Sequence, residues 1–193
     1  MTDLEIRSSG PEDAEGVEEV VEQSFGDQAT SIVDVLARLR SVEDLRVELV
    51  AEDDDGVHGY VALSRAWLDA RERLVDVLVL SPLGVRPERQ GTGIGTALLA
   101  AAVEAAAEDG APLVFLEGSP DFYAARGWDA ASDHRLDRPS VRIPDQACRV
   151  MLLPAHEPWM TGRLVYPDVW WRRDLVGLRD PDLAAVEAAT RPD

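Results

Sequence analysis

A chain of 193 residues, of which 46% are hydrophobic, is long enough to bury one sizeable core, and a single domain spanning residues 1–193 is expected. The formal net charge of −18 argues against nucleic acid and anionic membranes as partners, because like charges repel. The sequence has no apolar run of membrane-spanning length and no signal-peptide pattern at its start, which predicts a cytoplasmic protein.

The first third of the chain predicts a strand, two helices and a hairpin. Residues 4–7 alternate as a strand does, and residues 10–13 carry the proline and acidic residues of a helix start. Two apolar stripes at helical spacing follow: Val17, Val20, Val21 and Phe25, then Ile32, Val35, Leu36 and Leu39. Residues 45–63 alternate on both sides of the turn at residues 53–56, which predicts a β-hairpin.

The middle of the chain joins a strongly apolar segment to a helix through glycines. Residues 74–80 predict a central strand, which Pro82 should interrupt because proline has no N–H to donate. Residues 94–108 predict a helix that ends before Gly110. The connection reads Gln90-Gly91-Thr92-Gly93-Ile94-Gly95-Thr96. Helix N-termini present N–H groups without intrahelical partners, and glycine permits close approach, so this loop predicts a phosphate site.

The last third of the chain is predicted in less detail. Residues 113–116 indicate a strand and residues 120–126 a short helix. Strands are also predicted at residues 149–153 and 162–171, and residues 174–193 should form a loosely packed tail or a helix.

Spacing separates the glycine loop from two other phosphate-binding loops. A Walker loop requires Gly-Lys-Ser/Thr, and this chain has no lysine. A dinucleotide fingerprint that starts at Gly91 would need glycine at position 96, where Thr96 stands. The remaining pattern, Gln-x-x-Gly-x-Gly after Val85-Arg86-Pro87, resembles the acetyl-CoA loop of the GNAT N-acetyltransferase superfamily. Residues 122–128, Phe-Tyr-Ala-Ala-Arg-Gly-Trp, are similar to a second signature of that family.

The resemblance implies an α/β (α+β) GNAT fold. Its central, mixed and mostly antiparallel sheet would have about six to seven strands flanked by helices, with a β-bulge and splayed strands 4 and 5. The implied activity is transfer of the acetyl group of acetyl-CoA to a primary amine of a small molecule or peptide, by direct attack in a ternary complex. The implied cofactor-binding residues are Leu83, Val85, Gln90, Gly91, Thr92, Gly93, Ile94, Gly95, Thr96 and Ser119.

The same resemblance assigns a general acid but leaves the general base open. Tyr123 stands where many family members have the tyrosine that protonates the CoA thiolate. Where many members have a glutamate base this chain has Ser81, which cannot act as a base by itself. Three alternatives to a glutamate at this position remain. The base can be the carboxylate of Glu117 or Asp76, Ser81 can order a water molecule, or the amine can arrive already neutral.

Other polar and aromatic side chains are expected to have ordinary structural roles. Cys148, the single cysteine, should be small and buried, and no Cys/His cluster has zinc spacing, so no metal is expected. His58, His134 and His156 are expected at the surface. Two interpretations remain for the C-terminal aromatic residues, namely packing or a cation–π wall for an alkylamine; these are Trp159, Tyr166, Trp170 and Trp171.

Competing functions follow from the same residues. An acyl group other than acetyl is compatible with the loop, which reads the CoA phosphates and not the acyl chain. A non-catalytic acyl-CoA-binding regulatory or interaction module is made plausible by Ser81, whereas Tyr123 argues for an enzyme. Action on charged tRNA is disfavoured by the net charge, which suits a cationic amine better. Both a monomer and a homodimer are compatible with the sequence.

Overall fold

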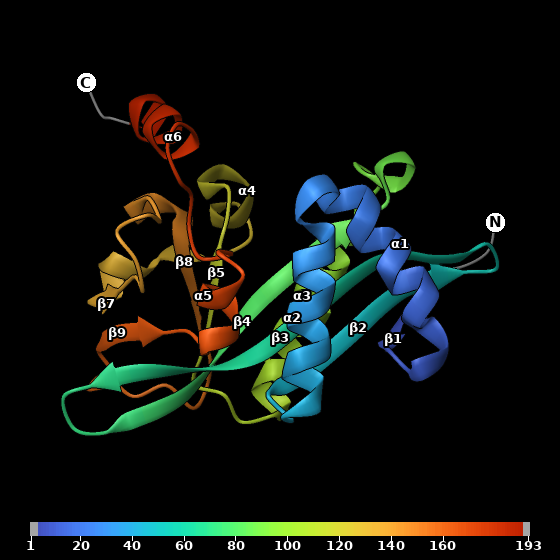
Figure 1. The fold of residues 1–193 in the computed structure, drawn as a ribbon. Coiled ribbons are helices and arrows are strands. Elements are labelled where there is room, and N and C mark those ends of the chain that lie inside the picture. The colour runs from blue at the N-terminus through green and yellow to red at the C-terminus, as the bar shows by residue number, and fades with distance from the viewer. Residues whose placement is uncertain (1–3, 191–193) are drawn as a thin grey trace. The chain divides into compact units, whose positions relative to one another are not determined.

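The computed structural model describes residues 4–190, which fall into two compact units (Figure 1). The first unit contains the chain up to Arg65 together with Leu78–Ala111. The second contains Ala66–Val77 and the chain from Pro112 onward. The expectation of a single domain over residues 1–193 stays a prediction.

The first unit is built on four strands in the order β1-β2-β3-β4. They are β1 (Glu5–Ser8), β2 (Leu45–Asp53), β3 (Gly56–Ala70) and β4 (Leu74–Val85), of which β3 and β4 continue into the second unit. β2 pairs antiparallel with both β1 and β3, and the turn between β2 and β3 confirms the predicted hairpin. The alternation of residues 45–63 was therefore a sufficient signal for this part of the sheet.

Three helices cover the two faces of these strands. α1 (Ala14–Phe25) and α2 (Ala29–Ser41) lie on one face, and α3 (Ile94–Glu108) lies behind the sheet in the view of Figure 1. The apolar stripes predicted for the first two helices are buried apart from Phe25, which is half-buried. α3 has the predicted bounds, because a glycine precedes it and Gly110 follows it.

A β-bulge at His58 sets which side chains face which helix. Ala51 pairs with Gly59 and Glu52 pairs with Val57, so His58 is an extra residue in β3. Val57 therefore packs against Gly16 of α1, whereas a Cβ at Gly59 would lie 2.8 Å from Cδ1 of Leu98 in α3. The same bulge makes the surface prediction for His58 wrong, since this side chain is only 5% exposed.

The predicted interruption of the central strand at Pro82 is also wrong. β4 continues to Val85, and the peptide bond between Ser81 and Pro82 is cis. One missing N–H removes one possible ladder hydrogen bond, and the residues on both sides of Pro82 remain extended. The bulge expected in strand 4 and its separation from strand 5 stay predictions.

The second unit contains shorter strands. β5 (Leu113–Glu117), β8 (Cys148–Leu152) and β6 (Asp129–Ala130) follow in that order and pair antiparallel. β9 (Gly162–Val165) pairs antiparallel with Trp67–Ala70 of β3 and parallel with β7 (Leu136–Asp137). Cys148 is buried as predicted, and burial raises the pKa of its thiol to about 12.

Short helices complete the second unit. They are α4 (Pro120–Ala124), α5 (Asp168–Arg172) and α6 (Asp182–Thr190). The strand predicted over residues 162–171 is therefore wrong beyond Val165, where Pro167 precedes the first turn of α5. One-turn 3₁₀ helices occur at Pro11–Asp13, Gly26–Gln28, Pro87–Arg89, Ala131–His134 and Asp145–Ala147.

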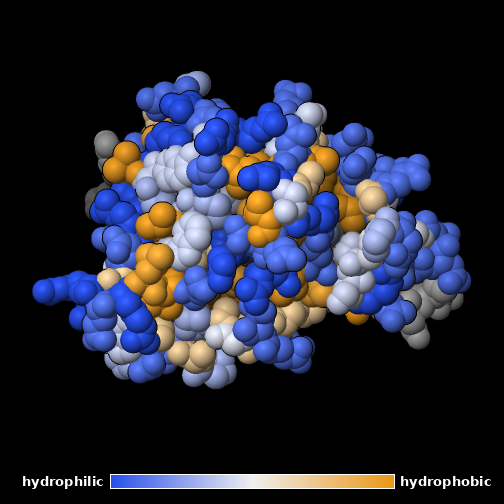
Figure 2. Space-filling model, turned by 60° about the horizontal axis from the view of Figure 1, so that its bottom comes forward, coloured by the Kyte–Doolittle hydropathy of each residue, from blue (hydrophilic) through white to orange (hydrophobic). Residues whose placement is uncertain are grey.

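These elements confirm the predicted fold class, a mixed α/β protein with a mostly antiparallel sheet flanked by helices. None of the helices within residues 4–190 is long and apolar enough to cross a membrane. On the face shown in Figure 2, apolar residues lie between hydrophilic ones. The large apolar side chains that are exposed in the described part of the chain are Leu4, Val42, Leu74, Val141, Val165 and Trp171.

A partly buried ion-pair network joins the first two strands to the start of α1. The guanidinium of Arg7 donates to both carboxylate oxygens of Asp13, at 2.7 Å each, and its Nε lies 2.6 Å from Oε1 of Glu52. Asp13 is 5% exposed and also accepts the backbone N–H of Gly10. The hydrogen bonds from Arg7 hold the pKa of Asp13 below its usual value, although burial opposes this shift.

Removing the Asp13 carboxylate should destabilise the first unit, because Arg7 and the N–H of Gly10 lose their shared acceptor. We expect Asp13→Ala to lower the free energy of unfolding by about 3 kcal/mol, as measured by urea denaturation. Glu12→Gln, which alters an exposed neighbour in the same turn, serves as the control and should stay within about 0.5 kcal/mol of the wild type. Equal effects of both substitutions would contradict this assignment.

Candidate functional site

The glycine loop of the first unit presents the N-terminus of α3. Gly91 and Gly93 have φ of 75° and 95°, a left-handed conformation that side chains disfavour. Gly93 is the N-cap residue, and the first hydrogen bond inside the helix runs from the N–H of Ala97 to its carbonyl, at 3.0 Å. The N–H groups of Ile94 and Gly95 thus precede the hydrogen-bonded part of the helix.

Two side-chain hydrogen bonds brace the loop. Oγ1 of Thr92 donates to the carbonyl of Arg89 at 2.6 Å, and the Gln90 side-chain amide donates to the carbonyl of Val85 at 3.0 Å. Atoms built as Cβ on Gly91 and Gly93 would meet nothing within 4 Å. The outer side of the loop is therefore open to a ligand, and the side chain of Gln90 itself belongs to the scaffold.

Arg89, just before the loop, is paired with acidic side chains, a contact that was not predicted from the sequence. Nη2 of Arg89 lies 3.0 Å from Oδ2 of Asp53 and 3.6 Å from Oδ2 of Asp55. Oδ1 of Asp53 lies 2.6 Å from Nε2 of His58, the residue that the bulge turns inward. The run of aspartates in the hairpin turn was the available signal, but their partner is more than thirty residues away in the sequence.

The end of β4 lies against the C-terminus of α1. Oγ of Ser24 donates to the carbonyl of Val85 at 3.3 Å, and a Cβ at Gly84 would lie 2.9 Å from the same hydroxyl. Leu83 and Val85 are half-buried and lie at the C-terminal end of this strand. Cγ2 of Val85 is also the neighbour that a Cβ at Gly95 would meet, at 3.6 Å. The structure thus brings together Leu83, Val85 and the predicted loop residues Gln90 to Thr96 in the first unit.

Glu117, the predicted alternative base, ends β5 in the second unit. Its carboxylate is half-buried, accepts the N–H of Gly177 at 3.0 Å and is hydrogen-bonded by Tyr166. Burial raises the pKa of Glu117 to about 7, and the hydrogen bonds from Tyr166 and Gly177 limit this rise. Asp76, the other carboxylate considered, is exposed in β4.

Tyr123 is held by aromatic packing on α4. Its ring makes edge contacts with Phe122, at a centroid distance of 4.9 Å, and with Trp128, at 6.1 Å. A Cβ at Gly118 would lie 2.3 Å from Cε2 of Tyr123, so the ring packs directly on the backbone there. Burial raises the pKa of Tyr123, and the charge of Arg126 opposes the shift. Ser119, the remaining predicted cofactor residue, is the exposed N-cap of α4.

The C-terminal aromatic residues do not form one ligand wall. Tyr166 and Trp170 are buried, at 5% and 3% exposure, whereas Trp171 is exposed. The guanidinium of Arg73 lies 4.3 Å from the ring centroid of Trp159, so this cation–π position is taken by a side chain of the protein itself. These contacts favour the packing interpretation.

Comparison with known proteins identifies the family. The sequence profile described as "Acetyltransferase (GNAT) domain" matches residues 5–131, about two thirds of the chain. The chain belongs to the GNAT acetyltransferase family, as its two motifs predicted. It is 27% identical over 157 residues to a protein of Escherichia coli described as "Uncharacterized N-acetyltransferase YjhQ", covering 79% of this chain and 86% of that one.

Solved structures show the same fold. The chain resembles the GNAT family N-acetyltransferase YhbS of Escherichia coli in complex with CoA, with a TM-score of 0.79 and 27% identity, over 89% of this chain and 94% of the other. A GNAT family acetyltransferase of Brucella melitensis in complex with acetyl-CoA has a TM-score of 0.70 and 24% identity, over 87% and 98%. In the part of the chain that the structure describes, no three or more His, Cys, Asp or Glu side chains are arranged so that they could hold a metal ion.

The buried carboxyl of Glu117 predicts a pH dependence of stability. Its folded pKa of about 7 lies above the ordinary value of 4.5, so the stabilisation is fully present below the ordinary pKa and is lost as the pH rises through 7. Since one pKa unit corresponds to about 1.4 kcal/mol, and the group is partly exposed, the expected loss between about pH 5 and pH 8 is about 2 kcal/mol.

Denaturation of Glu117→Gln at both pH values tests this assignment. The variant should lose most of that pH dependence, because a glutamine does not ionise. Glu157→Gln, a substitution at an exposed glutamate of the same unit, is the matched control and should keep it. A wild-type pH dependence that persists in Glu117→Gln would show that another group is responsible.

Proposed function

We propose that this protein is an N-acetyltransferase that transfers the acetyl group of acetyl-CoA to a primary amine of a small molecule or peptide. The observation that carries the proposal is the open, left-handed turn at Gly91 and Gly93 ahead of α3, in a chain of the GNAT family. Further support comes from the relatives of similar fold whose structures contain CoA or acetyl-CoA.

The first unit fits the phosphate part of such a ligand. A helix N-terminus favours negative charge, and the glycines leave room for a pyrophosphate on the outer side of the loop. In the proposal the N–H groups from Gly91 to Thr96 hold the pyrophosphate, and the main chain of Leu83 and Val85 pairs with the pantetheine arm. Ser119 of the second unit is proposed as a further cofactor contact. The bound cosubstrate supplies an acetyl group activated as a thioester.

Tyr123 is the proposed general acid. Its raised pKa keeps the phenol protonated at neutral pH, as a donor toward a thiolate requires. The edge contacts with Phe122 and Trp128 fix the ring, so little conformational freedom is left to lose in the reaction. No hydrogen bond is formed by the Tyr123 hydroxyl within residues 4–190, which leaves its proton available for a ligand.

Glu117 is the proposed proton acceptor for the amine. A carboxyl with a pKa of about 7 is half ionised near neutral pH, which suits a general base. Because the same carboxylate also holds the N–H of Gly177, the kinetics of Glu117→Gln have to be compared with its stability. The net charge of −18 favours an acceptor that is cationic before it loses its proton, and for the same reason we do not propose nucleic acid as a partner.

A second candidate function is a non-catalytic acyl-CoA-binding module. The observation in its favour is Ser81, which occupies the position where many family members have a glutamate base. Such a module would bind CoA as the enzyme does, and replacing Tyr123 would then have no measurable consequence. The two substitutions below separate the cofactor site from the chemistry.

Gly93→Val should remove cofactor affinity. The branched side chain would stand in the space proposed for phosphate and would strain the left-handed backbone. We expect the Kd for CoA in titration calorimetry to rise by at least about 100-fold, equivalent to about 2.7 kcal/mol. Gly110→Val is the matched control, since Gly110 has φ of 81° at the other end of α3 and faces open space. A normal Kd for Gly93→Val would refute the phosphate assignment.

Tyr123→Phe should impair turnover more than binding. Loss of a positioned acid lowers kcat by roughly 100-fold, and the retained ring should keep the Kd for CoA within about two-fold of the wild type. Release of free thiol from acetyl-CoA in the presence of an amine library measures the rate. Unchanged kcat would exclude Tyr123 as the acid, and absence of turnover with every amine in both proteins would favour the binding module.

A further inference from the structure

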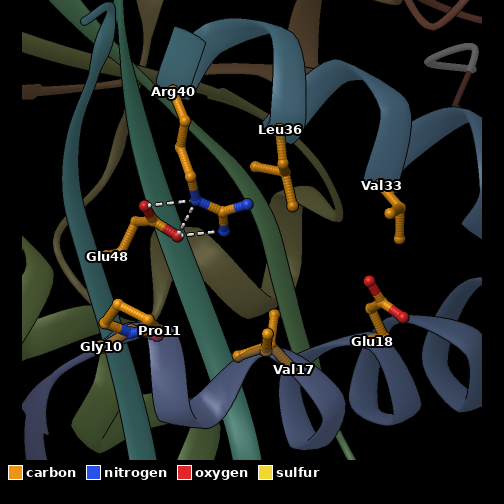
Figure 3. A pocket seen from close by; sticks show the side chains of 10 residues that line it. Gly10, Pro11, Val17, Glu18, Val33, Leu36, Arg40 and Glu48 are labelled. Carbon is orange, nitrogen blue, oxygen red and sulfur yellow. Dashed lines mark hydrogen bonds and ion pairs between the residues drawn. The ribbon is translucent and has the colours of Figure 1, made fainter.

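A pocket lies in the first unit between the starts of α1 and β2 and the side of α2 that carries Val33, Leu36 and Arg40. Its volume is about 380 Å³, at the small end of the range of ligand pockets. Figure 3 shows the side chains of Arg40 and Leu36 from α2, Val17 and Glu18 from α1, and Glu48 from β2 around this space. None of the predicted cofactor or catalytic residues lines it.

At one end of the pocket, Arg40 and Glu48 form a hydrogen-bonded ion pair. Nε of Arg40 lies 2.9 Å from Oε1 of Glu48, and the hydroxyl of Tyr60 donates to Oε2 of Glu48 at 2.6 Å. Tyr60 is completely buried, so it holds Glu48 in place from beneath. Since Arg40 compensates the charge of Glu48, this end of the pocket is close to neutral.

The other end combines apolar walls with an acidic side chain. Val17 and Leu36 are buried, Val33 is half-buried, and Glu18 points toward Val33 across the pocket (Figure 3). Glu18 forms no ion pair with any other residue that the structure describes. The charged side chains that line the pocket are Glu18, Glu48 and Arg40, so the net charge of the lining is −1. This negative charge is that of Glu18, which lies next to apolar side chains.

We propose that this pocket binds a small organic ammonium ion with an apolar body. The ammonium group would pair with Glu18, and the hydrocarbon part would cover Val17, Val33 and Leu36. The net charge of −18 adds a long-range attraction for such a cation and repels the corresponding carboxylate. Burial of the hydrocarbon part against these side chains provides the rest of the affinity.

The pocket is distinct from the proposed cofactor site. It contacts α1 at Ala14, Val17 and Glu18, whereas the other end of the same helix, at Ser24 and Phe25, packs on Gly84 of β4. Six residues of helix separate Glu18 from Ser24, which corresponds to roughly 9 Å along the axis. Binding at the pocket is therefore testable without acetyl-CoA and does not depend on the proposed enzymatic activity.

The first experiment titrates the full-length protein, labelled with ¹³C at its methyl groups, with n-hexylammonium chloride. We expect saturable NMR shifts of the methyl groups of Val17, Val33 and Leu36. 1-Hexanol, which has the same chain without the charge, should cause the same shifts with a Kd about five-fold higher, and hexanoate should bind more weakly still. Shifts that avoid these three residues, or equal affinity for all three probes, would overturn the proposal.

Three variants identify the groups responsible. Glu18→Gln should weaken hexylammonium binding about five-fold and leave hexanol binding unchanged. Glu22→Gln removes the same charge one helical turn away, outside the pocket, and should have a much smaller effect. Ala14→Leu, which fills space at an exposed lining position, should weaken binding of both probes. Equal effects of Glu18→Gln and Glu22→Gln, or unchanged binding to Ala14→Leu, would contradict a site in this pocket.

Discussion

The left-handed backbone at Gly93 decides where the first amides of α3 point, and the proposed chemistry depends on those amides. A residue with a Cβ is strained at this φ, so the orientation of the helix N-terminus is tied to glycine. The helix that follows is rigid because its apolar face is buried on the sheet, with Leu98 against the bare backbone of Gly59. The proposed anion site thus rests on backbone conformation and helix packing, and the proposal requires no basic side chain.

The two arginines near the loop, Arg86 and Arg89, make contacts within the protein. Arg89 is engaged by Asp53 and Asp55, and Nε of Arg86 donates to the carbonyl of Val57 at 2.7 Å. Both arginines join the loop to the β2–β3 hairpin, where the bulge at His58 places the acceptors. This chain has no lysine, and Arg89 is already paired with aspartates, so the proposal assigns the attraction for phosphate to the helix N-terminus.

The sequence predicted the parts of this protein whose signals are local. The glycines before and after α3 predicted both ends of this helix correctly, and the alternation of apolar and polar residues predicted the first hairpin. Features that depend on distant partners were missed: the inward position of His58 follows from a bulge, and the cluster of Asp53 with Arg89 joins two loops. β6 and β7 are too short, at two residues each, to leave a periodic pattern. The pocket beside Glu18 arises where α1, α2 and β2 meet, which no single segment encodes.

The central claim is that backbone amides at the start of α3 bind the pyrophosphate of CoA, and backbone NMR of the ¹⁵N-labelled protein tests it most directly. On titration with CoA, the amide protons of Gly93, Ile94 and Gly95 should move downfield, as they do when an N–H gains an anionic acceptor, and they should saturate together with the heat measured by calorimetry. Saturable binding of CoA that leaves these amides unshifted, or a complete lack of binding at millimolar CoA, would contradict the account.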